Sequence, residues 1–128
     1  MHEFAVAGGL IDAAVDIAQR ENLDRVTRVQ CRIGDLRQVD SWLLDEAFAA
    51  AREGTRCAGA ELCVERVHME MDCDSCGTTF RVMDWNWACP GCGEIGRNAR
   101  GGDELELIEI DGVSNDEYRS LEKCVREE

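Results

Sequence analysis

The pattern of hydrophobic and polar positions predicts a helix followed by a strand at the start of the chain. Over residues 4–22 the apolar side chains recur at helical spacing, with polar side chains mostly opposite. Gly8-Gly9 weakens the first part of this helix, and Asn22 is its expected end. Over residues 26–33 every second side chain is mostly apolar, as in a strand that buries one face.

A second helix is predicted over residues 41–53. Asp40 or Ser41 is placed to cap its first turn, and Gly54 is placed to end it. We expect the apolar face of this helix to pack against the rest of the fold. That face is formed by Trp42, Leu43, Ala47, Phe48 and Ala51.

Two more strands are predicted, one on each side of a cysteine-rich segment. The first covers residues 60–71, with a bulge near Glu65-Arg66 where the apolar positions shift by one. The second covers residues 103–110, where leucine alternates with glutamate. The segment between them is therefore an insertion between two strands.

Four cysteines in two close pairs define this insertion. Cys73 and Cys76 form one C-x2-C pair, and Cys89 and Cys92 form a second pair twelve residues later. Each pair aims two sulfurs at one point, and two facing pairs make the tetrahedral four-sulfur site that Zn²⁺ prefers. Most closed sites of this kind are structural. The glycines expected to relax the backbone of the two turns are Gly77, Gly91 and Gly93.

These elements predict an α+β fold, in which a small three-stranded sheet with two helices carries an inserted four-cysteine, zinc-ribbon-like domain. The expected boundaries assign residues 1–70 and 100–111 to the sheet and helices, and residues 71–99 to the insert. Residues 112–128 form a C-terminal extension. The capping-box spacing of Ser114 and Glu117 allows a short helix there, and a frayed tail is an equal alternative.

Composition and charge narrow the range of functions. The 128 residues carry a net charge of −13, which argues against nucleic acid as a partner because phosphates would repel the chain. No apolar run is long enough to span a membrane and no signal peptide begins the chain, so we expect a cytoplasmic protein with no membrane partner. Thiols in that compartment are metal ligands or buried residues more often than disulfides. Four cysteines are expected to be such plain core or surface residues: Cys31, Cys57, Cys63 and Cys124.

The first three residues, Met1-His2-Glu3, offer a second pattern for metal binding. A free α-amine, the following backbone amides and the His2 imidazole can surround one ion in small chelate rings. A planar nitrogen set of this kind suits Ni²⁺ or Cu²⁺ rather than Zn²⁺. A solvated terminal histidine is the other interpretation, and the residues alone leave both open.

Several motifs follow one another along residues 1–111 in a fixed order. They are Met1-His2-Glu3, Ile33-Gly34-Asp35 followed by Val39-Asp40, the two cysteine pairs, and Gly102-Asp103-Glu104-Leu105. This order and spacing resemble the HypA/HybF family of hydrogenase nickel-incorporation proteins. Some members of the family carry a histidine directly after a cysteine pair, where this chain has Gly77 and Gly93. That difference argues against an exchange of cysteine for histidine ligands here.

The resemblance implies a nickel metallochaperone, not an enzyme, that delivers Ni²⁺ for assembly of the [NiFe]-hydrogenase active site. It implies nickel ligands at Met1, His2 and Glu3, with Asp40 as a weaker candidate that is also a helix N-cap, and a structural Zn²⁺ on the four paired cysteines. The implied partners are a HypB-type GTPase, which we expect to meet the first helix beside His2, and the hydrogenase large-subunit precursor. We expect a monomer or a weak homodimer.

Two other functions follow from the residues. The cysteine pairs resemble a rubredoxin iron site, hence an electron-transfer module, although seven aromatic residues are few for the core around such a site. The other is a zinc-ribbon interaction protein. A hydrolytic zinc enzyme is disfavoured, because neither H-E-x-x-H nor G-x-S-x-G occurs. His68 is expected on a strand face, and Trp85 and Trp87 are expected either to pack across the insert or to present a partner surface.

Overall fold

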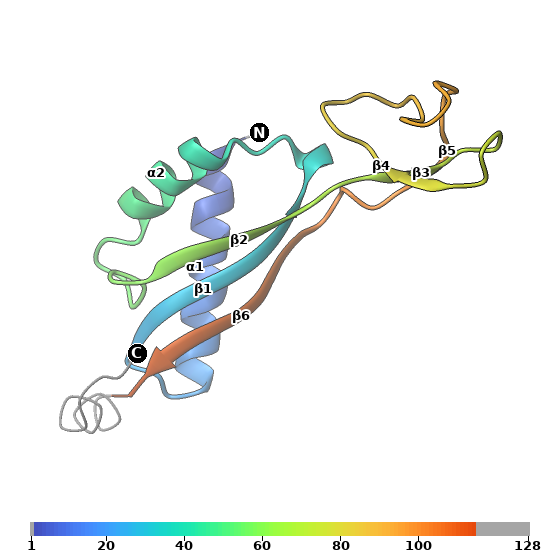
Figure 1. Cartoon of the computed structure of the whole chain (residues 1–128). Helices are drawn as coiled ribbons and strands as arrows, with labels where there is room; N and C mark the ends of the chain where they lie inside the picture. Colours follow the sequence, from blue (N-terminus) through green and yellow to red (C-terminus); the bar gives the residue numbers. More distant parts are fainter. Residues whose placement is uncertain (1, 115–128) are drawn as a thin grey trace, which may run out of the picture. The chain divides into compact units, whose positions relative to one another are not determined.

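The structure is a computed structural model that describes residues 2–114 (Figure 1). The predicted fold class is confirmed, since two helices and two small sheets form an α+β fold with a zinc-ribbon-like insert. In order, the elements are α1 (Glu3–Arg20), β1 (Arg25–Gly34), the 3-10 turn η1 (Asp35–Arg37), α2 (Ser41–Ala51), β2 (Glu61–Val67), β3 (Glu70–Asp72), β4 (Thr79–Arg81), β5 (Arg97–Arg100) and β6 (Leu105–Val113). Met1, Cys124, Glu117 and the predicted C-terminal helix lie outside the described residues.

The chain divides into two compact units. Unit 1 comprises residues 1–31, 39–64 and 107–128, and unit 2 comprises residues 32–38 and 65–106. The first contains both helices, and the second contains the four paired cysteines. The domain boundaries that we drew from the sequence at residues 70 and 100 stay a prediction. No described helix has the length and apolar character needed to cross a membrane.

Helix α1 supplies much of the core of unit 1. It begins and ends within two residues of the prediction, and it runs through Gly8-Gly9 without a break. Its buried stripe is rich in alanine, and small side chains let the helix approach its neighbours closely. Figure 1 shows α1 lying across one face of a sheet whose strand order is β2-β1-β6. The buried residues of the helix are Val6, Ala7, Leu10, Ile11, Ala14 and Ala18.

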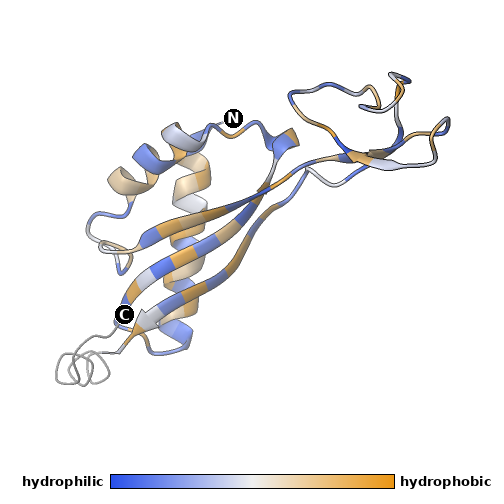
Figure 2. Ribbon diagram, in the orientation of Figure 1, coloured by the Kyte–Doolittle hydropathy of each residue, from blue (hydrophilic) through white to orange (hydrophobic). Residues whose placement is uncertain are grey.

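Strand β1 is the central strand of that sheet, as its alternating sequence predicts. Val29 and Cys31 are fully buried, whereas Arg28 and Gln30, which alternate with them, are half-buried. Figure 2 shows the resulting bands of hydrophilic and hydrophobic residues along the strands. Each apolar side chain buried in this way contributes about 1.5–3 kcal/mol to the free energy of unfolding.

Helix α2 differs from the prediction in the face that it buries. Leu44, Ala47 and Phe48 are buried, but Trp42 and Leu43 are exposed. Residues 44, 47 and 48 already complete one i, i+3, i+4 stripe. Because successive helix residues are about 100° apart, Trp42 points away from that stripe and Leu43 lies at its edge. The prediction that Trp42 and Leu43 pack on the fold is therefore wrong.

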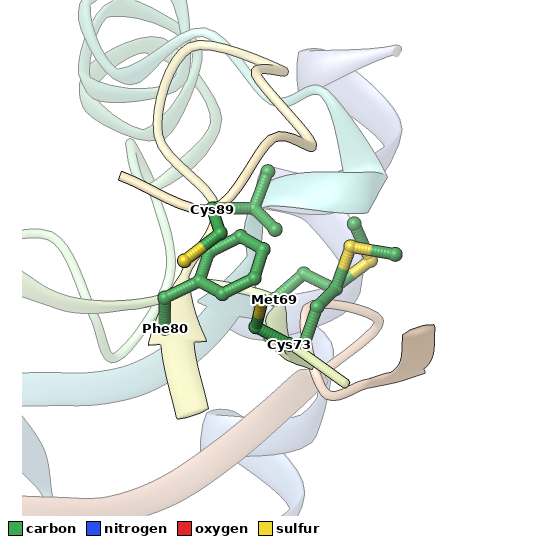
Figure 3. Close-up of a cluster of buried hydrophobic side chains, with 6 residues drawn as sticks. Met69, Cys73, Phe80 and Cys89 are labelled. Atoms are coloured by element: carbon green, nitrogen blue, oxygen red, sulfur yellow. The ribbon is translucent and has the colours of Figure 1, made fainter. Parts of the chain in front are cut away.

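The strand predicted over residues 60–71 is two strands in different sheets. The chain leaves β2 after Val67 and enters β3 at Glu70, so the break falls at His68-Met69 and not at the predicted bulge. In unit 2, β3 is the middle strand of the order β4-β3-β5, and both pairings are antiparallel. A cluster of six buried side chains, most of them sulfur-containing or aromatic, forms a core in this unit (Figure 3). They are Met69, Met71, Cys73, Phe80, Val82 and Cys89.

Two of the motifs found in the sequence form one contact inside unit 2. The amide of Gly34 donates to the carbonyl of Glu104 at 2.8 Å, and the amide of Leu36 donates to the carbonyl of Gly102 at 2.7 Å. A Cβ atom on Gly34 would lie 2.1 Å from the carbonyl carbon of Gly102. The absence of a side chain at position 34 is what allows these two backbones to touch.

Candidate metal centres

The two cysteine pairs form turns with the same hydrogen-bond pattern. In the first, Gly77 N–H donates to the carbonyl of Cys73 at 2.7 Å, and Cys73 N–H donates to the carbonyl of Thr78 at 2.8 Å. In the second, Gly93 N–H donates to the carbonyl of Cys89, and Cys89 N–H donates to the carbonyl of Glu94, each at 2.8 Å. The closing glycines have φ of +73° and +83°, which side chains rarely adopt. Gly91 has no positive φ, so the expectation that it supplies relaxed backbone geometry is wrong.

The four sulfurs are gathered at one point of unit 2. The Sγ atoms of Cys73, Cys76, Cys89 and Cys92 all lie within 4.8 Å of one another, and those of Cys73 and Cys92 are 3.4 Å apart. In a regular tetrahedron with Zn–S bonds of 2.3 Å the sulfurs are about 3.8 Å apart. The arrangement therefore fits a tetrahedral ion with little movement. Cys73 and Cys89 are buried, and Cys76 and Cys92 are exposed.

The pKa values of these thiols also favour the binding of a cation between them. Amide hydrogen bonds from Gly91 and Cys92 lower the pKa of Cys89 to about 7. Hydrogen bonds shared with Cys92 and Cys73 raise the pKa of Cys76 to about 12. Four thiolates at this spacing repel one another unless a positive ion lies between them. A divalent metal would remove the repulsion and allow all four sulfurs to ionise.

Two of the predicted nickel ligands, Glu3 and Asp40, are in contact where α1 and α2 begin. Asp40 N–H donates to the Glu3 carboxylate at 2.9 Å, and this bond joins the first turn of α1 to the residue that caps α2. The same bond lowers the pKa of Glu3. Of the two N-cap candidates that the sequence offers, Asp40 and Ser41, the structure has Asp40, since its Oδ1 accepts from Leu43 N–H at 2.9 Å.

His2 directly precedes Glu3 in the chain. It is exposed and precedes α1 as its N-cap residue. The first bond within the helix runs from Val6 N–H to the carbonyl of His2 at 3.1 Å. The amides of residues 2 and 3 are therefore not used by the helix, as holds for the first amides of any helix. Met1, the remaining predicted ligand, lies outside the described residues.

A second histidine pairs with an acid that sequence reasoning did not connect to it. In unit 2, His68 Nδ1 and Asp35 Oδ2 are 2.6 Å apart. Both residues line a cavity of about 620 Å³, and Met83 and Trp85 also line it. His68 was expected on a strand face, but it follows the end of β2. Only the turn at residues 34–37, whose course depends on tertiary contacts, brings Asp35 to it.

Comparison with known proteins decides the family. A family model described as "Hydrogenase/urease nickel incorporation, metallochaperone, hypA" matches residues 1–112. The chain belongs to the HypA family. The family resemblance predicted from the sequence motifs is thereby confirmed, and the match includes the N-terminal residues, Asp40 and all four paired cysteines.

Relatives within the HypA family match over nearly their whole length. "Hydrogenase maturation factor HypA" of Desulfitobacterium hafniense is 34% identical over 111 residues, covering 87% of this chain and 97% of the relative. The protein of the same name from Aquifex aeolicus is 33% identical over 111 residues, covering 87% and 96%. The solution structure of the Ni metallochaperone HypA from Helicobacter pylori matches with a TM-score of 0.61 and 25% identity, covering 90% of this chain and all of that one.

Proposed function

We propose that this HypA-family chain is a nickel metallochaperone that delivers Ni²⁺ for assembly of the [NiFe]-hydrogenase active site in the cytoplasm. The observation that carries the proposal is the hydrogen bond from Asp40 N–H to the Glu3 carboxylate, which brings two of the predicted ligands together next to His2 in the chain. These are the donors that a small, exposed nickel site needs, and they belong to a chain whose family handles nickel.

In the proposed nickel site, nitrogen atoms are the main ligands and carboxylate oxygens are the additional ones. The α-amine of Met1, the amides of His2 and Glu3 and the His2 imidazole supply a planar nitrogen set, which Ni²⁺ accepts. The carboxylates of Glu3 and Asp40 stand next to it. Protons compete with the metal for the amine, the imidazole and the amides, so nickel affinity should fall as pH falls. Because the site has few ligands and is exposed, a bound nickel ion can be released again.

The four-cysteine site has a different role in this proposal. It holds a structural Zn²⁺, and because all four positions are thiolates it has no open position for catalysis. The chain therefore acts by binding and transfer and is not an enzyme. The partners that we propose are a HypB-type GTPase and the precursor of the hydrogenase large subunit.

Nickel titration of the untagged protein tests this function. The variant His2→Ala is expected to lose tight nickel binding and to keep its zinc content and its circular dichroism spectrum. Adding one residue before Met1 is expected to have the same effect, because the α-amine then leaves the chelate. The matched control is His68→Ala, the other histidine of the chain, which should keep its nickel affinity. Unchanged nickel affinity in the His2→Ala variant would disprove the proposed site.

A further inference from the structure

The cavity of unit 2 combines apolar walls with side chains that accept hydrogen bonds. Its volume of about 620 Å³ is in the usual range for a ligand site. All of its lining residues belong to unit 2, so the site is formed within one compact body. Leu36 and Met83 supply part of the apolar wall. The polar groups that line the same cavity therefore decide which ligand it takes.

The ring of His68 is one of these groups, and Asp35 fixes which of its nitrogens faces a ligand. The 2.6 Å contact joins His68 Nδ1 to Asp35 Oδ2. Because a carboxylate only accepts hydrogen bonds, Nδ1 carries the hydrogen of this bond. In the neutral ring, Nε2 then keeps its lone pair. His68 therefore offers an acceptor whose orientation is set before any ligand arrives.

A strained turn supplies the next two groups. Asn86 N–H donates to the carbonyl of Met83 at 2.9 Å, and Asp84 and Trp85 between them have φ of +51° and +59°. Two successive positive φ angles are those of a type I′ turn, which glycine and asparagine usually occupy. Tryptophan rarely adopts this conformation. Backbone strain of this kind is concentrated at sites of function, and here it sets a carboxylate beside an indole ring on the cavity wall.

These two side chains are available to a ligand. Within residues 2–114, neither the Asp84 carboxylate nor the Trp85 indole forms a hydrogen bond or an ion pair. Trp85 is 51% exposed, so the cavity opens to solvent beside it. Arg66, which also lines the cavity, already takes part in interactions within the protein. The groups left for a ligand are thus a carboxylate, an imidazole lone pair and an aromatic face.

We propose that this cavity binds an arginine side chain of another protein. A guanidinium group is planar, carries five N–H donors and no acceptor, and stacks on aromatic rings. Its donors match Asp84 and His68 Nε2, and its plane matches the ring of Trp85. The aliphatic stem of arginine would lie against the apolar wall. The net charge of −13 also favours the approach of a basic surface. The inference does not depend on nickel and goes beyond the proposed function.

The experiment is a titration of the full-length, zinc-loaded, ¹⁵N-labelled protein with the blocked tripeptide glycyl-arginyl-glycine amide. A saturable shift of the Trp85 indole N–H signal is expected, with a dissociation constant on the order of 1 mM for so small a probe. The same peptide with citrulline, which has the shape of arginine without its charge, should bind about 10-fold more weakly. Methylguanidine, which lacks the stem, should also bind about 10-fold more weakly.

Protein variants locate the site. Asp84→Asn is expected to weaken binding of the arginine peptide about 10-fold and to keep the turn, because asparagine tolerates a positive φ. The matched control is Asp103→Asn, which removes an exposed carboxylate of unit 2 that does not line the cavity. Trp87→Ala is the control for the aromatic wall, since Trp87 is 42% exposed and does not line the cavity either. Both controls should bind the peptide as the wild type does, and zinc content checks that each variant is folded.

Four results would overturn the proposal. The first is the absence of a saturable shift in the wild type. The second is equal affinity for the citrulline peptide or for methylguanidine, since the charge or the stem would then not be recognised. The third is an equal loss in Asp84→Asn and Asp103→Asn, which would reduce the effect to net charge. The fourth is equal affinity for a lysine peptide, which would overturn the assignment to arginine.

Discussion

At the scale of single residues, glycines in this chain have opposite physical roles. Gly34 allows two backbones to touch, and a Cβ atom there would lie 2.1 Å from backbone atoms of Gly102 that have no room to move. Gly9 lies inside α1, where a Cβ atom would meet nothing within 4 Å. The first glycine is therefore required by the fold, and the second only adds freedom to the unfolded chain.

Alanine substitutions at these two positions should have effects of opposite sign. Gly34→Ala is expected to lower the free energy of unfolding by about 3 kcal/mol, because overpacking forces the touching backbones apart. Gly9→Ala is expected to raise it by about 0.5–1 kcal/mol, the usual difference between glycine and alanine inside a helix. Urea unfolding of both variants checks this. A stable Gly34→Ala protein would mean that the contact with Gly102 is looser than described.

Sequence reasoning at this scale succeeded where a local rule applies. Asp40 as an N-cap follows from local sequence alone, and the structure confirms it. The bond from the Asp40 amide to Glu3 and the pairing of Asp35 with His68 were not predictable. Each joins residues 33 or more positions apart, and their meeting depends on how distant segments pack.

At the scale of elements, the sheet of unit 2 is held by an exposed ion pair as well as by its core. Arg100 Nη2 on β5 donates to Asp72 Oδ1 on β3 at 2.9 Å. Hydrogen bonds from Arg100, Thr79 and Asn98 lower the pKa of Asp72 to about 2 from an ordinary 3.8. Since the folded pKa is the lower one, this carboxylate stabilises the fold above pH 3.8, and the contribution disappears as pH falls toward 2.

Arg100→Ala should therefore raise the pKa of Asp72 toward its ordinary value, which carboxyl chemical shifts during an acid titration would measure. Acid unfolding of unit 2 should begin at a higher pH in this variant than in the wild type. Protonation of the metal-binding thiols occurs in both proteins, so the comparison isolates the ion pair. Arg97→Ala is the control, because Arg97 on the same strand pairs with Asp74 instead. If Asp72 has the same pKa in the wild type, in Arg100→Ala and in Arg97→Ala, then Arg100 does not set this pKa.

Element prediction depended on length and periodicity. The 18 residues of α1 and the 10 residues of β1 carry enough repeats to be recognised from sequence. Strands β4 and β5 have only three and four residues, too few to show alternation, and they were not predicted. The change of sheet at His68-Met69 was not visible in the pattern of residues 60–71, because β3 has only three residues, too few to show an alternation of their own.

At the scale of the whole molecule, we expect only unit 2 to depend on a metal for its folding. Two of the four metal-binding cysteines, Cys73 and Cys89, belong to the buried cluster of unit 2 (Figure 3). Unit 1 has its own core of helix and strand residues and contains none of the four ligands. Loss of a structural metal removes folding free energy only where its ligands are.

Chelation of the zinc, or the substitution Cys73→Ser, should therefore unfold unit 2 and leave the helices of unit 1 intact. The near-ultraviolet signal of Trp85 and Trp87, both in unit 2, should be lost while the far-ultraviolet helical signal is kept. The control is Cys63→Ser, outside the cluster, which should retain zinc. Simultaneous loss of both signals would mean that the units fold as one.

The repeated turns of the two cysteine pairs have a consequence for the order in which the metal site assembles. Each turn is closed by its own backbone bonds, Gly77 to Cys73 and Gly93 to Cys89, and therefore arranges its two sulfurs without help from the other. An arriving ion can be captured by either pair, and the second capture is then intramolecular, at the high effective concentration of a short loop. Release follows the reverse path, one pair at a time, so a competing ligand must displace two sulfurs before the ion can leave.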